Sequence, residues 1–391
     1  MKRLLDYDEM QELLSSLDNS IIEKQNPIGY STFGYAIDHY TYGNGKYHVI
    51  ITGGTHSSEL ISNVFVIRFM EKLSKKEIFI DPKIYTIHFI PFVNPEGTII
   101  VTSAIRTLIS KDMSEDAVQT YCLAYYRNCQ IEGDYAINYK DNSIKLQQMM
   151  FRHADYNCLD DKHKALKESL KSLFQKYDLP EGCLINWSSN GRGVDLNSNV
   201  ESSNFIDRIT NGEKIYDKLH LNNIIRSNPG PVGCPYYEIP GEIEKENEAL
   251  FNFYNKINTE NDFIGSLIYH SCGGLVYYLD GHNKINPWAK NDSYAKNDLK
   301  LAKIYASSAG YKLISEKLYT TMDAKIRTLF PITLLIELGR VRATPLAQFM
   351  DFDLPGSGED FKYVYTKIMT HNTNAILDTL PAMLEAYKNK F

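Results

Sequence analysis

The side chains best suited to chemistry in this sequence stand where predicted strands end. His56 and Glu59 follow the apolar run 47–53 at a strand-to-helix junction, so both can reach one ion if the turn is tight. His270 closes another apolar run, 263–270. Two imidazoles and one carboxylate leave a coordination position open for water, which is typical of a catalytic rather than a structural zinc ion. His56, Glu59 and His270 are therefore the candidate metal ligands.

A fourth polar side chain, Glu337, lies near the end of the apolar run 332–338. A zinc ion would polarise a scissile carbonyl and lower the pKa of its water towards about 7. Hydrolysis also needs a carboxylate that takes the water proton and passes it to the leaving nitrogen. Because an apolar strand rarely tolerates a charged residue without a reason, Glu337 is the candidate general base.

The spacing of His56 and Glu59 is a weak signal by itself, since a His and a Glu lie three positions apart in many chains. An ordinary loop histidine is the alternative for position 56. The agreement of all four residues is stronger evidence, because open α/β sheets bind ligands outside the carboxyl ends of their strands. Each of the four follows or ends an apolar stretch that would fix it to a rigid element.

The elements that must position these residues are expected to form an α/β fold. The predicted strands are 33–43, 47–53, 83–93, 263–270 and 332–338. A turn signal, Asn44-Gly45, separates the first two. Strands that alternate with helical patterns imply a mixed, mostly parallel twisted sheet with helices on both faces.

The pattern changes between about 103 and 186, where apolar residues recur at helical spacing, most clearly over 159–178. We interpret this stretch as a mostly helical insertion without a site of its own. No internal repeat or low-complexity linker divides the chain, so residues 1–391 are expected to form a single domain that carries the insertion. The segment 360–390 is also expected to be helical, with Pro381 as a kink or a break.

The composition is that of a soluble globular protein, with 43% hydrophobic and 23% charged residues. The net charge of −6 is spread without a basic stripe, so neither nucleic acid nor an anionic membrane is an expected partner. None of the six cysteines forms a CxxC pair, and no disulfide framework is expected. The first residues lack the apolar core of a signal peptide, which favours a cytoplasmic location.

The ordered motifs of this chain resemble those of the M14 zinc carboxypeptidases over most of its length outside the insertion. The matching motifs are Tyr30-Ser31-Thr32-Phe33-Gly34, Gly54-Thr55-His56-Ser57-Ser58-Glu59, Asn94-Pro95-Glu96-Gly97, Trp187 with Asn190-Gly191-Arg192-Gly193-Val194-Asp195-Leu196-Asn197, Tyr269-His270-Ser271 and Glu337-Leu338-Gly339-Arg340. The resemblance implies a zinc carboxypeptidase-like fold, one zinc ion per chain and a peptide substrate. It leaves the oligomeric state open.

The resemblance also implies roles in the block around Arg192. Asp195 would accept a hydrogen bond from a ligand imidazole and so fix its tautomer, and an ordinary loop aspartate is the alternative. Asn197 would donate to the terminal carboxylate of the substrate. Arg192 would stabilise the oxyanion, a contribution of about 3–4 kcal/mol by analogy with lost oxyanion donors. A structural ion pair is an equal alternative for Arg192.

Three further residues correspond to the family's specificity pocket. Met322 falls where the selecting side chain stands, and a thioether there argues against a pocket for Lys or Arg side chains. Asp323 lies 14 residues before Glu337, as the family's pocket aspartate does. Tyr319 is nearest to the family's mobile tyrosine, although a stray residue is the alternative in a chain with 28 tyrosines.

The sequence departs from the family where a terminal carboxylate is usually bound. Ser198 stands in place of the arginine that usually follows the asparagine, so half of that clamp is missing. Another arginine sometimes found in the first metal motif is Ser58 here. The candidates to supply the missing positive charge are Lys325, Arg327, Arg340 and Arg342.

Three functions are compatible with these motifs. Zinc-dependent hydrolysis of a peptide or isopeptide bond close to a free carboxylate comes first, and the missing arginine resembles bacterial members that act on cell-wall (murein) peptides. The second is a zinc amidohydrolase that deacylates N-acyl amino acids, although such enzymes tend to be shorter and to lack the GVDLN block. The third is a non-catalytic peptide-binding module, which only Ser198 favours.

Overall fold

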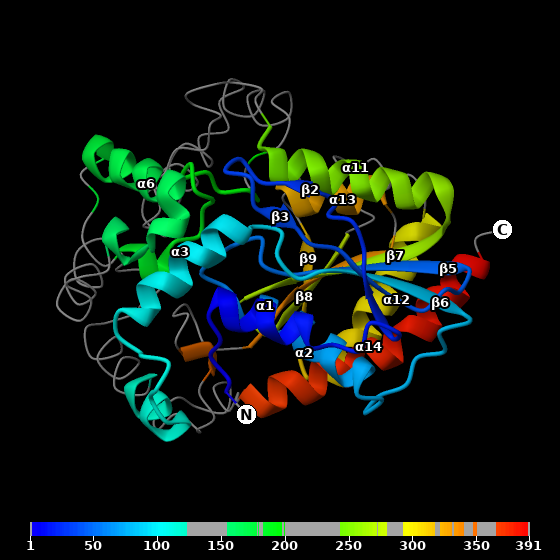
Figure 1. The fold of residues 1–391 in the computed structure, drawn as a ribbon. Coiled ribbons are helices and arrows are strands. Elements are labelled where there is room, and N and C mark those ends of the chain that lie inside the picture. The colour runs from blue at the N-terminus through cyan, green and yellow to red at the C-terminus, as the bar shows by residue number, and fades with distance from the viewer. Residues whose placement is uncertain are drawn as a thin grey trace.

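The computed structural model describes residues 2–122, 155–177, 179, 183–197, 199, 243–271, 273–279, 292–316, 321–330, 332–339, 347–349 and 365–389. Its centre is a mixed eight-stranded sheet in the order β1-β4-β6-β5-β7-β10-β8-β9 (Figure 1). The strands are β1 Ile22–Lys24, β4 Tyr40–Tyr42, β5 Tyr47–Thr52, β6 Tyr85–Ile90, β7 Asp262–His270, β8 Leu275–Leu279, β9 Lys312–Glu316 and β10 Thr333–Glu337. A separate pair is formed by β2 Gly29–Tyr30 and β3 Ala36–Ile37.

The four central strands β6, β5, β7 and β10 are parallel, whereas β4 and β8 run antiparallel to their inner neighbours. The predicted mixed, mostly parallel sheet is therefore confirmed. The runs 47–53, 83–93, 263–270 and 332–338 correspond to these four strands within a few residues. The stretch 33–43 differs, because it divides into β3 and β4, which belong to different sheets.

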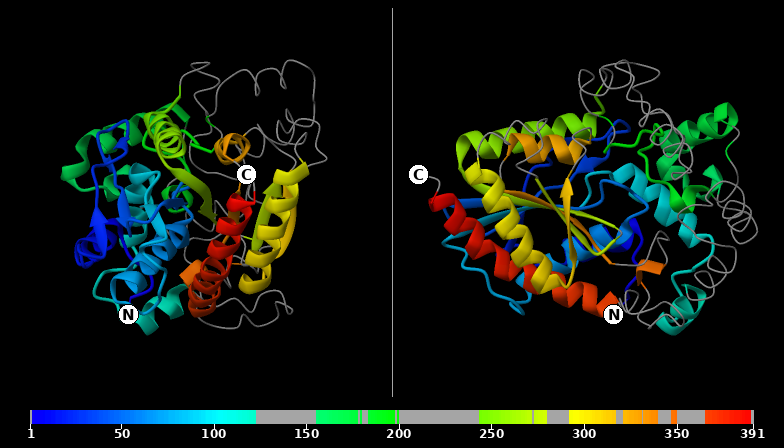
Figure 2. Two further views of the ribbon diagram at one scale, coloured as in Figure 1. Left: turned by 90° about the vertical axis from the view of Figure 1, so that its right-hand side faces the viewer. Right: turned by 180° about the vertical axis from the view of Figure 1, so that it is seen from behind.

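Helices cover both faces of the large sheet (Figures 1 and 2). One face carries α11 Lys245–Glu260 and α13 Met322–Leu329. The other face carries α1 Tyr7–Ser15, α2 Leu60–Ser74, α12 Asp292–Ala309 and α14 Tyr365–Lys388. At one end of the molecule lie α3 Pro95–Arg106 and α6 Lys164–Tyr177. The predicted helices on both faces are thus confirmed.

Successive residues of the central strands point to opposite faces, as the two-residue period of a strand requires. Val49 and Ile51 of β5 lie in the larger buried cluster, which also holds residues of α2 and α14, whereas Ile50 lies in the smaller cluster with residues of α11. On β7, Leu267 lies in the larger cluster and Ile268 in the smaller one. Burial on both faces explains why these strands are continuous apolar runs in the sequence.

The described parts of the segment 103–186 are mostly helical, with turns and bends at 107–114. Beyond α3, the helical parts comprise residues 115–122, α6 and the 3-10 helices Tyr156–Cys158, Asp161–His163 and Cys183–Asn186. A single domain that carries this segment as an insertion stays a prediction. The expected C-terminal helix is present as α14, which runs through Pro381 without a break.

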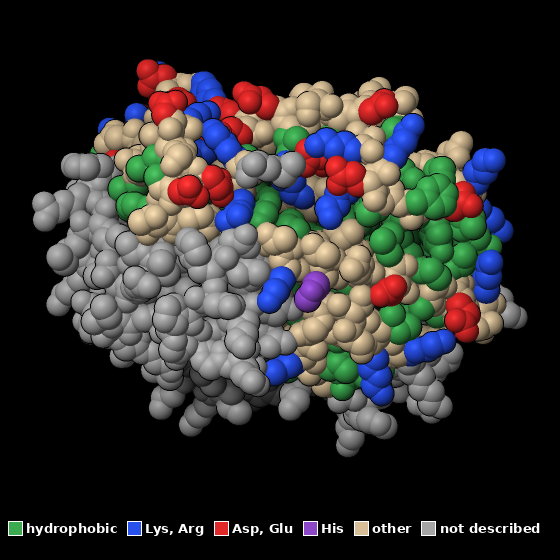
Figure 3. All heavy atoms as spheres, turned by 90° about the horizontal axis from the view of Figure 1, so that it is seen from below, with side chains coloured by type: hydrophobic (Ala, Val, Ile, Leu, Met, Phe, Trp, Pro, Cys, Tyr) green, Lys and Arg blue, Asp and Glu red, His purple; other side chains and the backbone are tan. Residues whose placement is uncertain are grey.

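Among the described helices, none is both long and apolar enough to span a bilayer. On the face shown in Figure 3, lysines and arginines lie among aspartates and glutamates, with apolar side chains between them. Positive and negative side chains are therefore mixed on that face, and they do not produce an electrostatic potential of a single sign there.

Three histidines form a row on the α11 face of the sheet. Nδ1 of His88, in β6, is 3.0 Å from Nε2 of His39, and its Nε2 is 2.8 Å from Nδ1 of His48. The ring of Phe253 packs against His39 and His88 at centroid distances of 4.7 and 5.6 Å. Burial lowers the pKa of His39 to about 4. Burial and the two neighbouring histidines lower the pKa of His88 to about 2.

We expect this row to make the fold sensitive to acid. The unfolded chain binds protons at these histidines near pH 6.5, whereas the folded chain resists them, so stability is complete above about pH 6.5 and falls below it. Between pH 7 and pH 5, the combined contribution of His39 and His88 to the free energy of unfolding should fall by about 4 kcal/mol. Urea denaturation at pH 7, 6 and 5 measures it when the unsubstituted protein is compared with variants that lack these histidines.

The variant His88→Gln isolates the contribution of one histidine, because glutamine cannot take up the proton. Its acid-induced loss over the same pH range should be smaller than that of the unsubstituted protein by about 2 kcal/mol. An equal loss in both proteins would show that His88 is not held neutral in the folded state.

Candidate metal centre

The predicted site residues meet because parallel strands end at the same edge of the sheet. In that sheet β7 lies between β5 and β10. His270, the last residue of β7, is in register with Glu337, the last residue of β10. The partner of Thr52, at the end of β5, is Ile268 on β7. The loop after β5 therefore begins next to His270.

The loop between β5 and α2 carries the first two predicted ligands, and its shape depends on Gly54. Gly54 has a φ of +71°, and a Cβ there would lie 2.0 Å from Nδ2 of Asn63, so a larger residue would be both strained and in collision. After this point the N–H of Glu59 donates to the carbonyl of His56 at 3.1 Å. The tight turn that the His-x-x-Glu pair requires is thus present.

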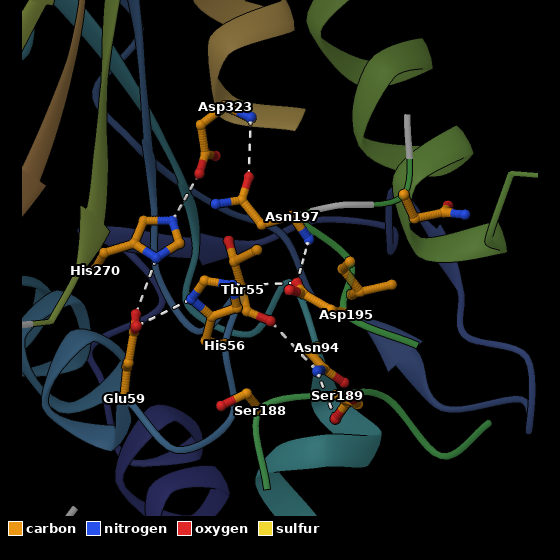
Figure 4. Close-up of polar contacts among 12 residues, drawn as sticks. Thr55, His56, Glu59, Asn94, Ser188, Ser189, Asp195, Asn197, His270 and Asp323 are labelled. Carbon is orange, nitrogen blue, oxygen red and sulfur yellow. Dashed lines mark hydrogen bonds and ion pairs between the residues drawn. The ribbon is translucent and has the colours of Figure 1, made fainter. Parts of the chain in front are cut away.

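Glu59 lies between the two histidines (Figure 4). Its Oε1 is 2.9 Å from Nδ1 of His56, and its Oε2 is 2.9 Å from Nδ1 of His270. The backbone N–H of Ser271 also donates to Oε2, at 3.1 Å. One ligand atom from each of His56, Glu59 and His270 lies within 4.8 Å of the other two. The three predicted ligands are therefore close enough to share one ion.

Each of these histidines has a carboxylate at its other ring nitrogen. Nε2 of His56 is 3.2 Å from Oδ1 of Asp195, the kind of contact that the family resemblance implied. Nε2 of His270 is 2.8 Å from Oδ2 of Asp323, a contact that the sequence did not predict. A carboxylate at Nε2 favours the tautomer that keeps the hydrogen there. When the imidazoles are neutral, both Nδ1 atoms then carry the lone pair that a cation needs.

Asn197 connects the two outer carboxylates. Its Oδ1 accepts the backbone N–H of Asp323 at 3.2 Å, and its own N–H donates to Oδ1 of Asp195 at 2.9 Å. The contacts form a closed circuit, which we call the carboxylate–imidazole ring. In order, its members are Asp195, His56, Glu59, His270, Asp323 and Asn197 (Figure 4). A shift of any member would therefore disturb both of its neighbours.

Two residues at the start of α3 hold the loops beneath this ring, a role that the sequence motif did not reveal. Nδ2 of Asn94 donates to the carbonyl of Thr55 at 3.3 Å and to that of Ser189 at 3.1 Å. Glu96, which has no exposed surface, accepts the N–H of Gly191 at 2.9 Å. The loop before His56 and the segment that leads to Asp195 are thereby tied to one helix start.

The carboxylates attract positive charge to the two histidines. Burial alone would lower the pKa of His56, but Glu59 and Asp195 outweigh it and raise that pKa to about 10. Asp323 and Glu59 likewise outweigh burial and raise the pKa of His270 well above its usual value. The two imidazoles in turn outweigh burial at Glu59 and lower its pKa to about 2. A metal ion must therefore compete with protons for the two Nδ1 atoms.

Glu337 adds a further carboxylate beside the ring. Burial first, and then the charge of Glu59, raise the pKa of Glu337 to about 8, against the opposing effect of the two histidines. The carboxylates that face the two imidazoles are Glu59, Asp195, Asp323 and Glu337. Because buried charges of one sign are costly unless they are paired, this surplus of negative charge fits a bound dication. The two imidazoles and Glu59 match the ligand types that catalytic zinc takes.

Arg192 pairs with a buried glutamate. Its Nη1 lies 3.3 Å from Oε1 of Glu244, a residue that is 1% exposed. Glu244 also accepts a hydrogen bond from Nδ2 of Asn190 at 2.9 Å. The structural ion pair that was the alternative for Arg192 is therefore present. Stabilisation of an oxyanion by Arg192 stays a prediction.

Met322 and the two described candidates for the missing positive charge, Lys325 and Arg327, are buried or contact other parts of the protein. Met322 has no exposed surface. Nζ of Lys325 lies 4.6 Å from the ring centroid of Phe251. Arg327 is 0% exposed and donates from Nε to the carbonyl of Thr333 at 3.3 Å. Outside the described residues lie Tyr319, Ser198, Arg340 and Arg342.

Known proteins that are similar to this chain include zinc carboxypeptidases. Residues 15–145 match the Peptidase_M14 family model, zinc carboxypeptidase. The structure of bovine thrombin-activatable fibrinolysis inhibitor in complex with tick carboxypeptidase inhibitor is similar, with a TM-score of 0.50 at 14% identity over 98% of this chain and 95% of that one. A second structure of thrombin-activatable fibrinolysis inhibitor gives 0.52 at 13% identity over 98% of this chain and 73% of that one.

A search of curated protein sequences finds no match to this chain. At 13–14% identity the structural likenesses show the fold, and the family model matches residues 15–145. Both agree with the expectation drawn from the motifs. Residues 15–145 thus match the zinc carboxypeptidase family model, and the chain has a carboxypeptidase-like α/β fold.

Proposed function

We propose that this protein hydrolyses a peptide or isopeptide bond close to a free carboxylate, with one zinc ion held by His56, Glu59 and His270. The carboxylate–imidazole ring carries the proposal, because it turns two Nδ1 atoms and one carboxylate towards a common centre. This ligand set keeps a coordination position open, as catalytic zinc requires. The match of residues 15–145 to zinc carboxypeptidases supports the same class of reaction.

Glu337 is the proposed general base. Zinc, when bound, would supply polarisation of the scissile carbonyl and a lower pKa for the attacking water. The carboxylate of Glu337, in register with His270, takes the proton of that water and returns it to the leaving nitrogen. Its pKa of about 8 gives it a high proton affinity, and a nearby dication would lower that pKa towards the working pH.

Asn197 supports recognition of the free carboxylate of the substrate. Because its Oδ1 accepts the N–H of Asp323, the orientation of the amide is fixed and Nδ2 remains as the end that can donate. The arginine that usually follows in the family is Ser198 here. We therefore propose a substrate whose carboxylate is bound without that arginine, such as a γ-D-glutamyl–diaminopimelate peptide of the bacterial cell wall.

Replacement of the base should separate catalysis from metal binding. Glu337→Gln removes the proton acceptor but no zinc ligand, so kcat should fall by about 10²- to 10⁴-fold while the zinc content stays unchanged. Steady-state kinetics and metal analysis on the same preparation measure both. Glu248→Gln, at an exposed position of α11, is the matched control and should retain full activity. Normal turnover by Glu337→Gln would refute the assignment of the base.

Zinc affinity should depend steeply on pH. Since the pKa of His56 is raised to about 10 and that of His270 is also raised, zinc binding at neutral pH must release protons from both. Each released proton changes the apparent affinity about tenfold per pH unit, so the release of two protons should tighten binding by about 10⁴-fold from pH 6 to pH 8. Competition with a chelator at several pH values measures this. A constant affinity would contradict the charge state derived for the ligands.

The substrate class can be tested with a small panel. If the cell-wall proposal holds, kcat/KM on a diaminopimelate-containing tripeptide should far exceed that on hippuryl amino acids, because hippuryl substrates suit the complete carboxylate clamp. Turnover of N-acyl amino acids alone would instead favour the amidohydrolase. A zinc-loaded protein that binds these peptides without cleaving any of them would favour the binding module.

A further inference from the structure

The carboxylate of Asp323 makes one close contact. Its Oδ2 lies 2.8 Å from Nε2 of His270, and both residues are only 1% exposed. Within the described part of the chain, the two oxygens of Asp323 and Nε2 of His270 have no partner with hydrogen-bond geometry, so the contact between them is a close ion pair. A buried carboxylate without any compensating charge would be strongly destabilising. The imidazole of His270 therefore explains why an aspartate is present at this position.

The backbone holds Asp323 in place. It is the second residue of α13, whose N-cap is Thr321, with a side chain that accepts the N–H of Ala324 at 3.1 Å. The N–H of Asp323 itself donates to Oδ1 of Asn197 at 3.2 Å. A carboxylate in the first turn is also favoured by the helix dipole, which stabilises its charged form. The start of α13 thus presents a fixed negative charge to His270.

This contact decides which nitrogen of His270 can bind a metal. The lone pair needed by zinc must be on Nδ1, the atom that faces Glu59, so the ring hydrogen must be on Nε2. We propose that Asp323 is a positioning residue of the metal centre, whose negative charge beside Nε2 keeps that hydrogen there and orients His270 through an ion pair, whereas Asp195 is within hydrogen-bond geometry of His56. The proposal rests on the proposed function, because it takes zinc as the bound ion.

The same contact removes Asp323 from substrate selection. A carboxylate that is 1% exposed and occupied by His270 cannot also pair with a basic side chain of the substrate. Met322, the neighbouring residue, is likewise without exposed surface. Asp323 is therefore part of the metal centre rather than an acidic specificity determinant, in contrast to the role that the family resemblance suggested.

The first test compares zinc affinity in two isosteric variants. Asp323→Asn keeps the size of the side chain and the backbone N–H to Asn197 but removes the charge at Nε2, so zinc should bind about 10- to 100-fold more weakly. Asp298→Asn is the matched control, since Asp298 is a buried aspartate of α12 that lies 3.9 Å from Arg327. That variant should bind zinc as tightly as the unsubstituted protein. Competition with a chelator measures all three proteins.

The second test observes the tautomer directly and does not depend on turnover. In long-range ¹H–¹⁵N spectra of the full chain, Nε2 of His270 should carry a hydrogen with a strongly downfield shift, as expected for a donor to a carboxylate. Asp323→Asn should move or abolish this resonance and leave that of His56 in place. The signal is assigned by its loss in His270→Gln.

Each outcome decides the proposal. Unchanged zinc affinity in folded Asp323→Asn, or a His270 Nε2 without hydrogen, would overturn it. If Asp323→Asn fails to fold, the spectrum of the unsubstituted protein alone decides. If the unsubstituted protein binds no zinc, the proposed function fails instead, and the shift of the Nε2–H resonance in the metal-free protein, compared with Asp323→Asn, still decides the assignment of Asp323.

Discussion

The site depends on one electrostatic constraint: several carboxylates are gathered around only two imidazoles in a largely buried space. Glu59 lies between His56 and His270, while Asp195 and Asp323 occupy their outer nitrogens. Such a group is stable only if positive charge enters it, either as protons on the histidines or as a metal ion. The raised histidine pKa values and the proposed zinc site are two consequences of this one arrangement.

The fold supplies the rigidity that this arrangement needs. The parallel strands β5, β7 and β10 bring two histidines and two glutamates to one edge of the sheet. The start of α3 ties the neighbouring loops together through Asn94, and the start of α13 contributes Asp323. Polar side chains placed by strand ends and helix starts keep their positions with little conformational freedom, which is what preorganised catalytic sites require.

The sequence predicted the central strands, and it placed the three candidate ligands close together, because apolar runs and strand ends are local features. The short strands β8 and β9 were not predicted. The contact of Asp323 with His270 was also missed, because no local pattern relates the start of a helix to the end of a distant strand. For Arg192 the sequence allowed two roles, and only the buried position of Glu244 shows its ion pair.

The most direct measurement is anomalous X-ray scattering at the zinc absorption edge from crystals of the zinc-loaded protein. Our account predicts one strong peak per chain, bound by Nδ1 of His56, the carboxylate of Glu59 and Nδ1 of His270, with room left for water. A peak bound by other residues, or no peak under zinc saturation, would contradict it.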